Sequence, residues 1–338
     1  MSVTSLTNLL QRTLAARHDL GLFDERHERA FRLFNGFLEG EPAVAVDLYG
    51  RTLLIHNYAN PPEAGEALVT AVQSFYLAQL PWLSSVVLKT RRGDQPETRN
   101  GRVVWGGQPD RWVREHGVRY ALDLLMNRDA SLYLDTRALR RWLMANTHGR
   151  DVLNTFAYTG SLGVAAYAGG ARQVIQTDLN KQFLNVGKTS YTLNGFPIDK
   201  KQFMTGDFWP LMNRLKREKR HFDVVILDPP FFSTTKRGTL DLAQDTARLI
   251  NKVRPLVRHG GQIVAINNAL FVSGAEYMAA LEAVGADGYV SVGELIPVTA
   301  DFTGVANTAV GELVCDPAPF NHATKIAVLN VHHKLNPA

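Results

Sequence analysis

Three aspartates, Asp178, Asp207 and Asp228, are the residues of this sequence best placed to bind a ligand or assist chemistry. Each follows a short run rich in apolar residues, as expected where a buried strand ends. In open α/β sheets, ligands bind outside the carboxyl ends of parallel strands. We therefore expect the three carboxylates to lie at one edge of a sheet.

The first two acids have both a ligand-binding and a structural interpretation. Asp178 could accept hydrogen bonds from ribose hydroxyls, or share the capping of the next helix with Asn180. Asp207 could accept a hydrogen bond from an adenine amino group, with Phe208 or Trp209 packed against the ring. It could equally cap the helix that follows it.

The segment Asp228-Pro229-Pro230-Phe231-Phe232 is a more specific signal. Its prolines fix the backbone where an acid and an aromatic residue leave the sheet. Such a loop can present a carboxylate and backbone carbonyls to the edge of a base, with Phe231 or Phe232 as a stacking platform. The simpler alternative is a strand end that the prolines terminate.

Residues 151–180 have the pattern of a strand–turn–helix–strand unit. An apolar run leads into a glycine turn, a helical run follows, and a second apolar run ends at Asp178. This is the first βαβ unit of a nucleotide-binding, doubly wound sheet. An ordinary βαβ turn without a ligand remains the alternative.

The glycines of this turn do not follow the dinucleotide-binding pattern. G-x-G-x-x-G seats a pyrophosphate with three glycines, whereas only Gly160 and Gly163 lie here, after Asn154, Phe156 and Tyr158. Gly160 would let the backbone pass close to a ligand. A polar and aromatic turn suits a ligand without phosphates, and S-adenosylmethionine fits better than a dinucleotide.

The periodicity predicts an α/β fold with a mostly parallel, Rossmann-like, seven-stranded sheet after a smaller α+β module. We expect a helical segment at 1–40, an α+β domain with an antiparallel sheet at 41–128 and the larger domain at 129–338. In the N-terminal part of the sequence, the apolar residues have a helical period at 4–18 and at 28–38. The apolar runs at 43–48 and 52–58 have the pattern of a β-hairpin. A helix at 132–146 would have Asp135 as its N-cap. The expected later strands are 152–156, 173–177, 200–204, 223–227, 261–266, 289–296 and 325–331, and the helices 161–168, 181–193, 208–218, 239–256 and 274–284.

Composition limits the functional classes. The 338 residues are 45% hydrophobic and 20% charged, which is typical of a globular protein with a sizeable core. Neither a signal peptide nor a membrane-length apolar run is visible. The single cysteine, Cys315, fits a reducing cytoplasm. The histidines show no metal-ligand spacing, so we expect no membrane and no metal. Residues 299–324 are long and irregular, as in a lid or binding loop.

A net charge of +5 favours a polyanionic partner without proving one. Basic residues with interleaved tryptophans can contact phosphates and stack on unpaired bases. A second basic run at 214–220 is alternatively a solvated helix end. The first set comprises Lys89, Arg91, Arg92, Arg99, Arg102, Arg111, Arg114, Arg119, Arg137, Arg140 and Arg141, with Trp105 and Trp112.

Taken together, several motifs resemble the bacterial class I S-adenosylmethionine-dependent methyltransferases that act on bases of 23S ribosomal RNA. The resemblance runs from about residue 32 to the C-terminus. Its carriers are residues 133–137 (YLDTR), 152–160 (VLNTFAYTG), 169–171 (GGA), Asp178, 194–195 (NG), Asp207 and 228–233 (DPPFFS).

The resemblance implies S-adenosylmethionine as methyl donor and 23S rRNA as partner, and it assigns roles to individual residues. The turn at 154–160 and Asp178, with Leu179 beside it, would hold the donor. Asp207 and Phe208 would lie near its adenine, and Asp228 and Pro229 near the reactive methyl, with Pro230 and Phe231 completing the catalytic loop. Tyr133 and Arg137 would close the site.

Two departures from the family's pattern bear on substrate. Family members commonly begin with a small RNA-binding PUA domain, whereas helical segments are expected before Glu41 here. Methylation of cytosine C5 requires a cysteine nucleophile, and the corresponding stretch reads Ile266-Asn267-Asn268-Ala269. The pattern instead resembles the branch that methylates guanine N7, and an exocyclic amine also suits the Asp-Pro-Pro-Phe loop.

We therefore predict a methyltransferase acting on a base nitrogen of ribosomal RNA. The alternatives are a methyltransferase of a protein or small molecule, a nicotinamide-dependent oxidoreductase, and a non-catalytic RNA-binding module.

Overall fold

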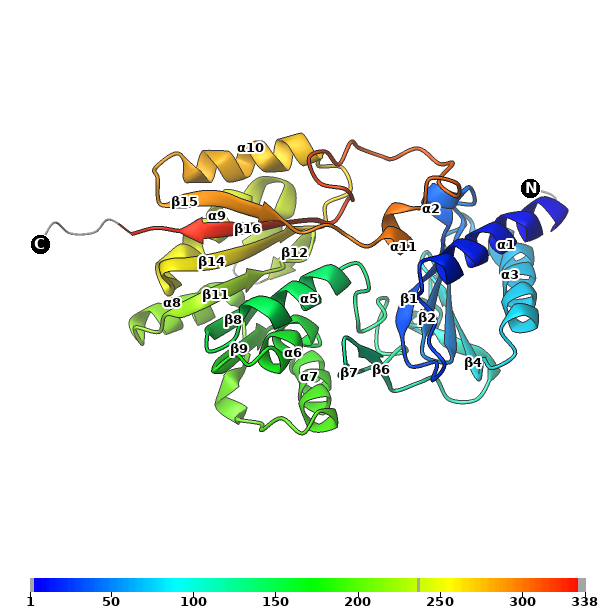
Figure 1. The fold of residues 1–338 in the computed structure, drawn as a ribbon, viewed down its shortest axis with the longest axis horizontal. Coiled ribbons are helices and arrows are strands. Elements are labelled where there is room, and N and C mark those ends of the chain that lie inside the picture. The colour runs from blue at the N-terminus through cyan, green and yellow to red at the C-terminus, as the bar shows by residue number, and fades with distance from the viewer. Residues whose placement is uncertain (1–2, 236–237, 334–338) are drawn as a thin grey trace, which may run out of the picture. The chain divides into compact units, whose positions relative to one another are not determined.

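The computed structural model describes residues 3–235 and 238–333, and the side chains of 5–231 and 245–333. It divides into two compact units. The first comprises Met1–Asp135 with Thr299–Leu313, and the second Thr136–Val298 with Val314–Ala338. Each unit has a sheet of its own (Figure 1).

The first unit is a five-stranded sheet with strand order β1-β2-β3-β4-β5. Helices α1 and α3 cover one face, where the apolar side chains of the strands and both helices form one core. The elements are α1 (Val3–Asp19), β1 (Ala30–Asn35), α2 (Gly36–Glu39), β2 (Val44–Tyr49), β3 (Thr52–Asn57), the 3-10 turn η1 (Pro62–Gly65), α3 (Glu66–Gln79), β4 (Ser85–Thr90), α4 (Pro96–Asn100), β5 (Arg102–Gly106), the hairpin β6 (Trp112–Glu115) with β7 (Val118–Ala121), and α11 (Ala300–Thr303).

Two expectations for this unit were wrong. The segment 28–38 is not a helix: it contains β1, in which Phe31 and Leu33 enter the core while Arg32 between them turns to Asp47 on the neighbouring strand. The sheet is not wholly antiparallel, because β3 and β4 pair in parallel. The reason is α3, which carries the chain back across the sheet as parallel pairing requires.

The second unit confirms the predicted α/β class with a mostly parallel seven-stranded sheet, in the order β10-β9-β8-β11-β14-β16-β15. Strand β16 is antiparallel to both of its neighbours. The elements are α5 (Arg137–Asn146), β8 (Asp151–Thr155), α6 (Ser161–Ala168), β9 (Gln173–Asp178), α7 (Lys181–Leu193), η2 (Lys200–Gln202), β10 (Phe203–Thr205), α8 (Phe208–Arg217), β11 (Phe222–Leu227), β12 (Phe232–Thr235), β13 (Gly238–Asp241), α9 (Leu242–Val253), η3 (Arg254–Leu256), β14 (Val257–Asn267), α10 (Gly274–Gly285), β15 (Val290–Leu295) and β16 (Lys325–Val331).

Helices cover both faces of this sheet (Figure 1) and turn their apolar sides toward it. Successive strand residues alternate between two cores, since side chains along a strand point to opposite faces. Leu153 and Val225 pack with α8, α9 and α10, whereas Val152 and Val224 pack with α5 and α6. This double burial explains the nearly continuous apolar runs of the strands.

Two expected helices begin later than predicted. The helix expected at 132–146 starts at Arg137, so Asp135 is not its N-cap and Thr136 takes that position. The residues before it belong to a loop in which the Leu132 carbonyl accepts a hydrogen bond from the Tyr49 hydroxyl. The helix expected at 239–256 starts at Leu242, because 238–241 pair as β13 with β12.

Candidate active site at the carboxyl edge of the sheet

The strand order brings the predicted loops to one edge of the second unit. Strand β8 lies between β9 and β11, and the chain leaves it first toward one side of the sheet and later toward the other. This is the topological switch point at which open α/β sheets bind ligands. Asp178 pairs in register with Thr205, and Leu227 with Thr155. The turn after β8, Asp178 and Asp228 therefore share this edge.

The turn after β8 has an unusual backbone. Phe156, Tyr158 and Gly160 all have positive φ angles, of 52°, 50° and 76°. Such conformations are uncommon without glycine and concentrate at functional sites. The Asp178 carboxylate holds the turn, because its Oδ2 accepts a hydrogen bond from the Tyr158 amide at 2.8 Å. The turn thus presents its amides and carbonyls in a fixed arrangement.

Buried polar side chains lie beneath the turn. Asn154 is 1% exposed and Gln176 is fully buried. The side-chain Nδ2 of Asn154 donates to Gln176 Oε1 at 3.3 Å. A Cβ at Gly160 or Gly163 would come within 2.5–2.6 Å of the Gln176 amide group. A side chain at either position would therefore displace the buried Gln176 amide group. Asn154, predicted to bind the cofactor, has its side chain directed to Gln176.

Asp178 is oriented by backbone amides on both sides. Besides the Tyr158 amide, its Oδ1 accepts from the Asn180 amide at 2.8 Å. Burial raises the pKa of the Asp178 carboxyl, and these hydrogen bonds oppose that rise. Capping of α7 falls to Asn180, whose side chain accepts from Gln182. The Leu179 amide is a third donor to this carboxylate, which leaves about one of its four lone-pair sites to accept from a ligand hydroxyl. Leu179 beside it is 63% exposed.

Asp207 caps α8, accepting from the Trp209 amide at 3.0 Å. Phe208 is buried and stacks on Phe156, with ring centroids 4.7 Å apart. The Phe208 ring therefore packs against the turn after β8 through Phe156. The Trp209 ring is covered by Arg248, whose guanidinium carbon lies 4.3 Å from the ring centroid.

The loop that follows β11 begins with Asp228 and places Phe231 at the surface, 44% exposed. Asp228 lies close to Tyr277 of α10: burial raises the pKa of Tyr277, and the Asp228 charge raises it further. An exposed aromatic ring in the same short loop as a carboxylate could stack on a base while the carboxylate accepts from the edge of that base. The side chains of Phe232 and Ser233 lie outside the described residues.

Sequence reasoning missed Lys325, which opens β16 opposite Asn267. Its ammonium group is buried and donates to the carbonyls of Ala269 at 3.0 Å and Ala323 at 2.6 Å. Burial lowers the pKa of Lys325 to about 8. The lysine fixes the loop after β14, whose tip exposes Leu270 and Phe271 by 55% and 72%. A lone lysine before an apolar strand gives no sequence signal for this role.

The comparisons with known proteins decide the family. Residues 45–309 match the family model of S-adenosylmethionine-dependent methyltransferases, which is more than half of the chain. The chain belongs to this family. It is therefore an enzyme that uses S-adenosylmethionine, and neither an oxidoreductase nor a non-catalytic binding module.

Similar proteins agree with this assignment. The methyltransferase is 34% identical over 246 residues to ribosomal RNA large subunit methyltransferase K/L of Shewanella amazonensis, and 32% identical to that of Shewanella loihica. The match covers 71% of this chain and 34% of each relative, so the chain spans about a third of their length. SMU.776, proposed to be a methyltransferase and solved with SAH, superposes with a TM-score of 0.85 at 22% identity, covering 98% and 82% of the two chains.

The residues of the methyltransferase fit the methyl donor. A carboxylate that can accept a further hydrogen bond stands at the end of the second strand of the unit, and the turn lacks the three-glycine pattern that seats phosphates. Tyr133 belongs to the first unit, is 42% exposed and donates to Asp129 at 3.0 Å. Arg137 is half-buried at the start of α5. Their role in closing the site stays a prediction.

The part of the chain that the structure describes contains no helix long and apolar enough to cross a membrane. Within the same residues, no three or more His, Cys, Asp or Glu side chains are grouped to hold a metal ion. Cys315 is a free thiol, half-buried in the second unit.

Proposed function

We propose that this methyltransferase transfers a methyl group to a base nitrogen of ribosomal RNA, either guanine N7 or an exocyclic amine. The observation that carries the proposal is the loop after β11, where a carboxylate and an exposed aromatic ring follow each other across two prolines. The names of the curated relatives, which are ribosomal RNA large subunit methyltransferases, support RNA as the substrate. The chain spans a third of those relatives, so their whole activity is not transferred.

We assign donor binding to the turn after β8 and to Asp178. The Asp178 carboxylate would accept from the ribose hydroxyls, and the fixed backbone of 156–160 would face the amino-acid end. Leu179 would contact the adenine from one side, and Asp207 would accept from its amino group. When bound, S-adenosylmethionine supplies an electrophilic methyl group on its sulfonium.

We assign base positioning to the loop after β11. Phe231 would stack on the target base, and Asp228 with the Pro229 carbonyl would accept hydrogen bonds from an amine at its edge, while Pro230 keeps the loop rigid. An amine polarised in this way is a better nucleophile. Guanine N7 already has a lone pair and no proton to lose. For that atom, orientation and exclusion of water would provide most of the catalysis.

Mass spectrometry of rRNA nucleosides tests the proposal. Ribosomal RNA from a strain that lacks the gene should be missing one methylated purine, which the wild-type gene should restore and the Asp228→Ala gene should not. Purified enzyme with methyl-labelled donor should then label the deletion-strain RNA. If the nucleoside profile of the deletion strain is unchanged and label enters only protein or small molecules, the substrate is not RNA.

A further inference from the structure

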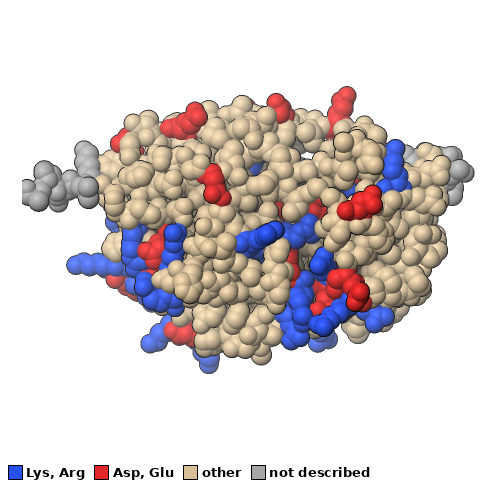
Figure 2. Space-filling model, viewed as in Figure 1, with Lys and Arg blue, Asp and Glu red and all other residues tan. Residues whose placement is uncertain are grey.

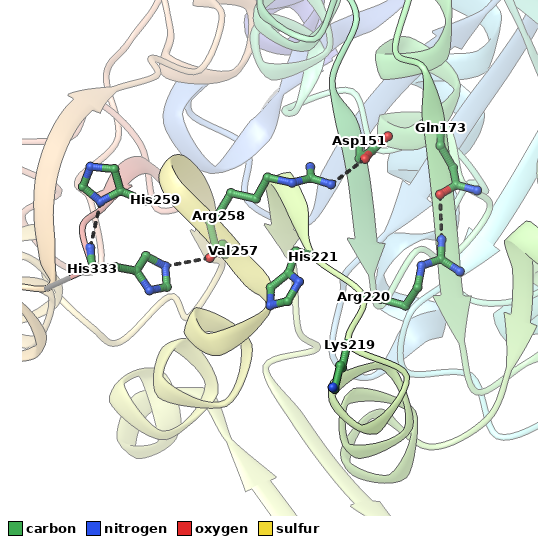
Figure 3. Close-up of a pocket in the computed structure, with 9 residues that line it drawn as sticks. All are labelled: Asp151, Gln173, Lys219, Arg220, His221, Val257, Arg258, His259 and His333. Carbon is green, nitrogen blue, oxygen red and sulfur yellow. Dashed lines mark hydrogen bonds and ion pairs between the residues drawn. The ribbon is translucent and has the colours of Figure 1, made fainter. Parts of the chain in front are cut away.

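Two grooves lie on the second unit away from the donor site. The first, of about 510 Å³, lies at the amino ends of the parallel strands, where Asp151 opens β8 and Gln173 opens β9. Figure 3 shows that Lys219 and Arg220 line this groove on one side, with Arg258 opposite. The second, of about 480 Å³, is lined by β10 and by α8, from Arg220 to Thr205.

The two grooves adjoin at one shared residue and together extend from the amino ends of β8 and β9 to the end of β10. They share Arg220, and the second groove includes all three residues of β10, the strand at one edge of the sheet. Thr205, at its far end, pairs in register with Asp178. A polymeric ligand that lies in both grooves would thus extend from the amino ends of the strands to Asp178, the acid to which we assign binding of the methyl donor.

The charge along this path is strongly positive. Seven lysines and arginines line the grooves or pair with residues that line them, and three acids do so. The net charge of this region is therefore +4, whereas the net charge of the whole chain is +5. Figure 2 shows basic side chains gathered over the ends of β8, β11 and α8. The seven are Arg172, Lys200, Lys201, Arg214, Lys219, Arg220 and Arg258, and the acids are Asp151, Glu218 and Asp223.

The acids neutralise only part of this charge. Arg172 and Arg258 share Asp151 and Asp223, and Arg214 pairs with Glu218. Arg220 donates to the neutral amide oxygen of Gln173 at 2.6 Å, and only the charge of Glu218, which also pairs with Arg214, partly offsets it. In the described part of the chain, the exposed Lys200, Lys201 and Lys219 form no ion pair. These cations remain available to an anionic ligand.

The length of the path selects the ligand. Strands of five or six residues rise about 3.3 Å per residue, so the two edges of the sheet are roughly 17–20 Å apart. A small anion can occupy one groove but cannot reach the donor edge from it. A single-stranded polyanion of several nucleotides can do both. Backbone phosphates, contacted by lysine and arginine without regard to sequence, match this arrangement.

We propose that the two grooves form one track for the sugar–phosphate backbone of the RNA substrate, running along β10 to the donor edge. The proposal rests on the assignment of RNA as substrate. The track supplies affinity and direction, while the loop after β11 selects the base. It also gives a role to the basic run at 214–220, for which the sequence alone left both a polyanion-binding role and a solvated helix end open.

The test compares two charge-matched double variants. Lys200→Gln/Lys219→Gln removes two unpaired cations from the track, and Arg12→Gln/Arg26→Gln removes two exposed cations of the first unit as the control. Each variant is titrated with protein-free 23S rRNA from the deletion strain over a range of salt concentrations. The methylation rate is then measured against RNA concentration, and affinity for S-adenosylhomocysteine by calorimetry.

The slope of log K against log salt is negative, and the track variant should reduce its magnitude by about 1.4, since each lost contact with a single strand removes about 0.7. Its KM for RNA should rise, with kcat and donor affinity as in the wild type. An unchanged slope and KM, or an equal loss in the control pair, would overturn the track. RNA binding that depends on the track without any methyl transfer would support the track and overturn the proposed function.

Discussion

At the scale of single residues, Asp178 combines two tasks in one carboxylate. It fixes the turn after β8 through the Tyr158 amide, and it can accept a further hydrogen bond at the donor edge. Sequence position alone left capping open as its role, and the structure gives that role to Asn180. The carboxylate therefore fixes the turn of the proposed donor site as well as lying at its edge.

Replacing this carboxylate by an amide should weaken donor binding. Asp178→Asn loses the charge that strengthens its hydrogen bonds, which are each worth about 1.5–3 kcal/mol when charged. We expect the affinity for S-adenosylhomocysteine to fall at least about tenfold by calorimetry. Asp199→Asn, the same change at a helix cap remote from this edge, should bind as the wild type does. Wild-type affinity in Asp178→Asn would contradict the assigned role.

Phe231 should matter to the RNA and not to the donor. Stacking of a base on an aromatic side chain contributes about 1–3 kcal/mol, so Phe231→Ala should lower kcat/KM for RNA by roughly 5- to 150-fold. Phe231→Tyr keeps the ring and serves as the control. Calorimetry with S-adenosylhomocysteine should give wild-type affinity for both variants. Equal kcat/KM values for Phe231→Ala and wild type would exclude the stacking role.

A buried histidine makes the stability of the first unit depend on pH. His56 Nε2 lies 3.2 Å from Asp47 Oδ2. Burial lowers the pKa of His56, although Asp47 opposes this shift. Burial alone would raise the pKa of Asp47, but the charge of Arg32 and the hydrogen bonds hold it well below its usual range. The stabilisation from ionised Asp47 is therefore lost only as the pH falls below about 4. The stabilisation from neutral His56 is lost at a higher pH during the same acidification.

Because folded His56 resists protonation, the unfolded chain binds more protons below about pH 6.5, and stability is lost as the pH falls through that value. The melting temperature should therefore drop between pH 7.5 and 5.5. His56→Gln should remove up to about 1.4 kcal/mol of this dependence per pH unit. His221→Gln, at an exposed histidine, should keep it. An identical pH profile in His56→Gln and wild type would disprove the attribution.

At the scale of elements, the sequence predicted most of the second unit because its signals are local. The helices 161–168 and 181–193 and the strand 325–331 have the predicted bounds. Glycines bound the first helix, Asn180 and Asn194-Gly195 the second, and a short apolar run marks the strand. Strand β1 was missed because two phenylalanines and a leucine around Arg32 fit a helix as well as a strand. Only the partner Asp47, 15 residues away, decides between them.

The sequence was sufficient to predict the loops that form the candidate site. It was not sufficient to predict the buried side-chain contacts that hold these loops. The acids after the strands could be found because strand ends share an edge. That Asn154 bonds to Gln176 and that Lys325 fixes the loop after β14 depends on strand pairing. No local pattern encodes such pairing.

Glycine variants of the turn after β8 should separate backbone strain from crowding. A Cβ at either Gly160 or Gly163 meets Gln176, but only Gly160 also has a left-handed backbone, with φ of 76°. We expect Gly163→Ala to be destabilised and Gln176→Ala to relieve much of this by making room. Gly160→Ala should retain about 1–2 kcal/mol of strain in the same background. Urea unfolding measures both, and equal rescue at the two positions would contradict this distinction.

At the scale of the whole molecule, the chain returns to its first unit near its end. Of residues 299–324, which the sequence suggested as a lid or binding loop, 299–313 belong to that unit and contribute α11 to it. The side-chain amide of Asn35 donates to the backbone carbonyl of Phe302. The backbone amide of Arg32 donates to the side-chain carboxylate of Asp301. These contacts join residues more than 260 positions apart. Sequence periodicity carries no information about contacts of this kind.

Arg17 lies at the centre of this long-range connection. It is fully buried, with both Nη atoms 2.8 Å from the Glu39 carboxylate and Nη2 3.2 Å from the Asp301 carbonyl. Glu39 also accepts from the Thr308 hydroxyl at 2.8 Å. One ion pair thus joins α1 and α2 to the returning segment.

Removing the arginine should loosen that segment as well as destabilise the first unit. Arg17→Met leaves Glu39 buried without its cation, which costs about 3–5 kcal/mol. Arg17→Met/Glu39→Gln should cost less than the sum of the single changes, because no buried charge remains. The amides of Val310 and Gly311, which donate to the Leu38 carbonyl, should exchange hydrogen faster in Arg17→Met. Arg12→Met, at an exposed position on α1, is the control. Unchanged exchange at those two amides would mean that the returning segment is held independently of the ion pair.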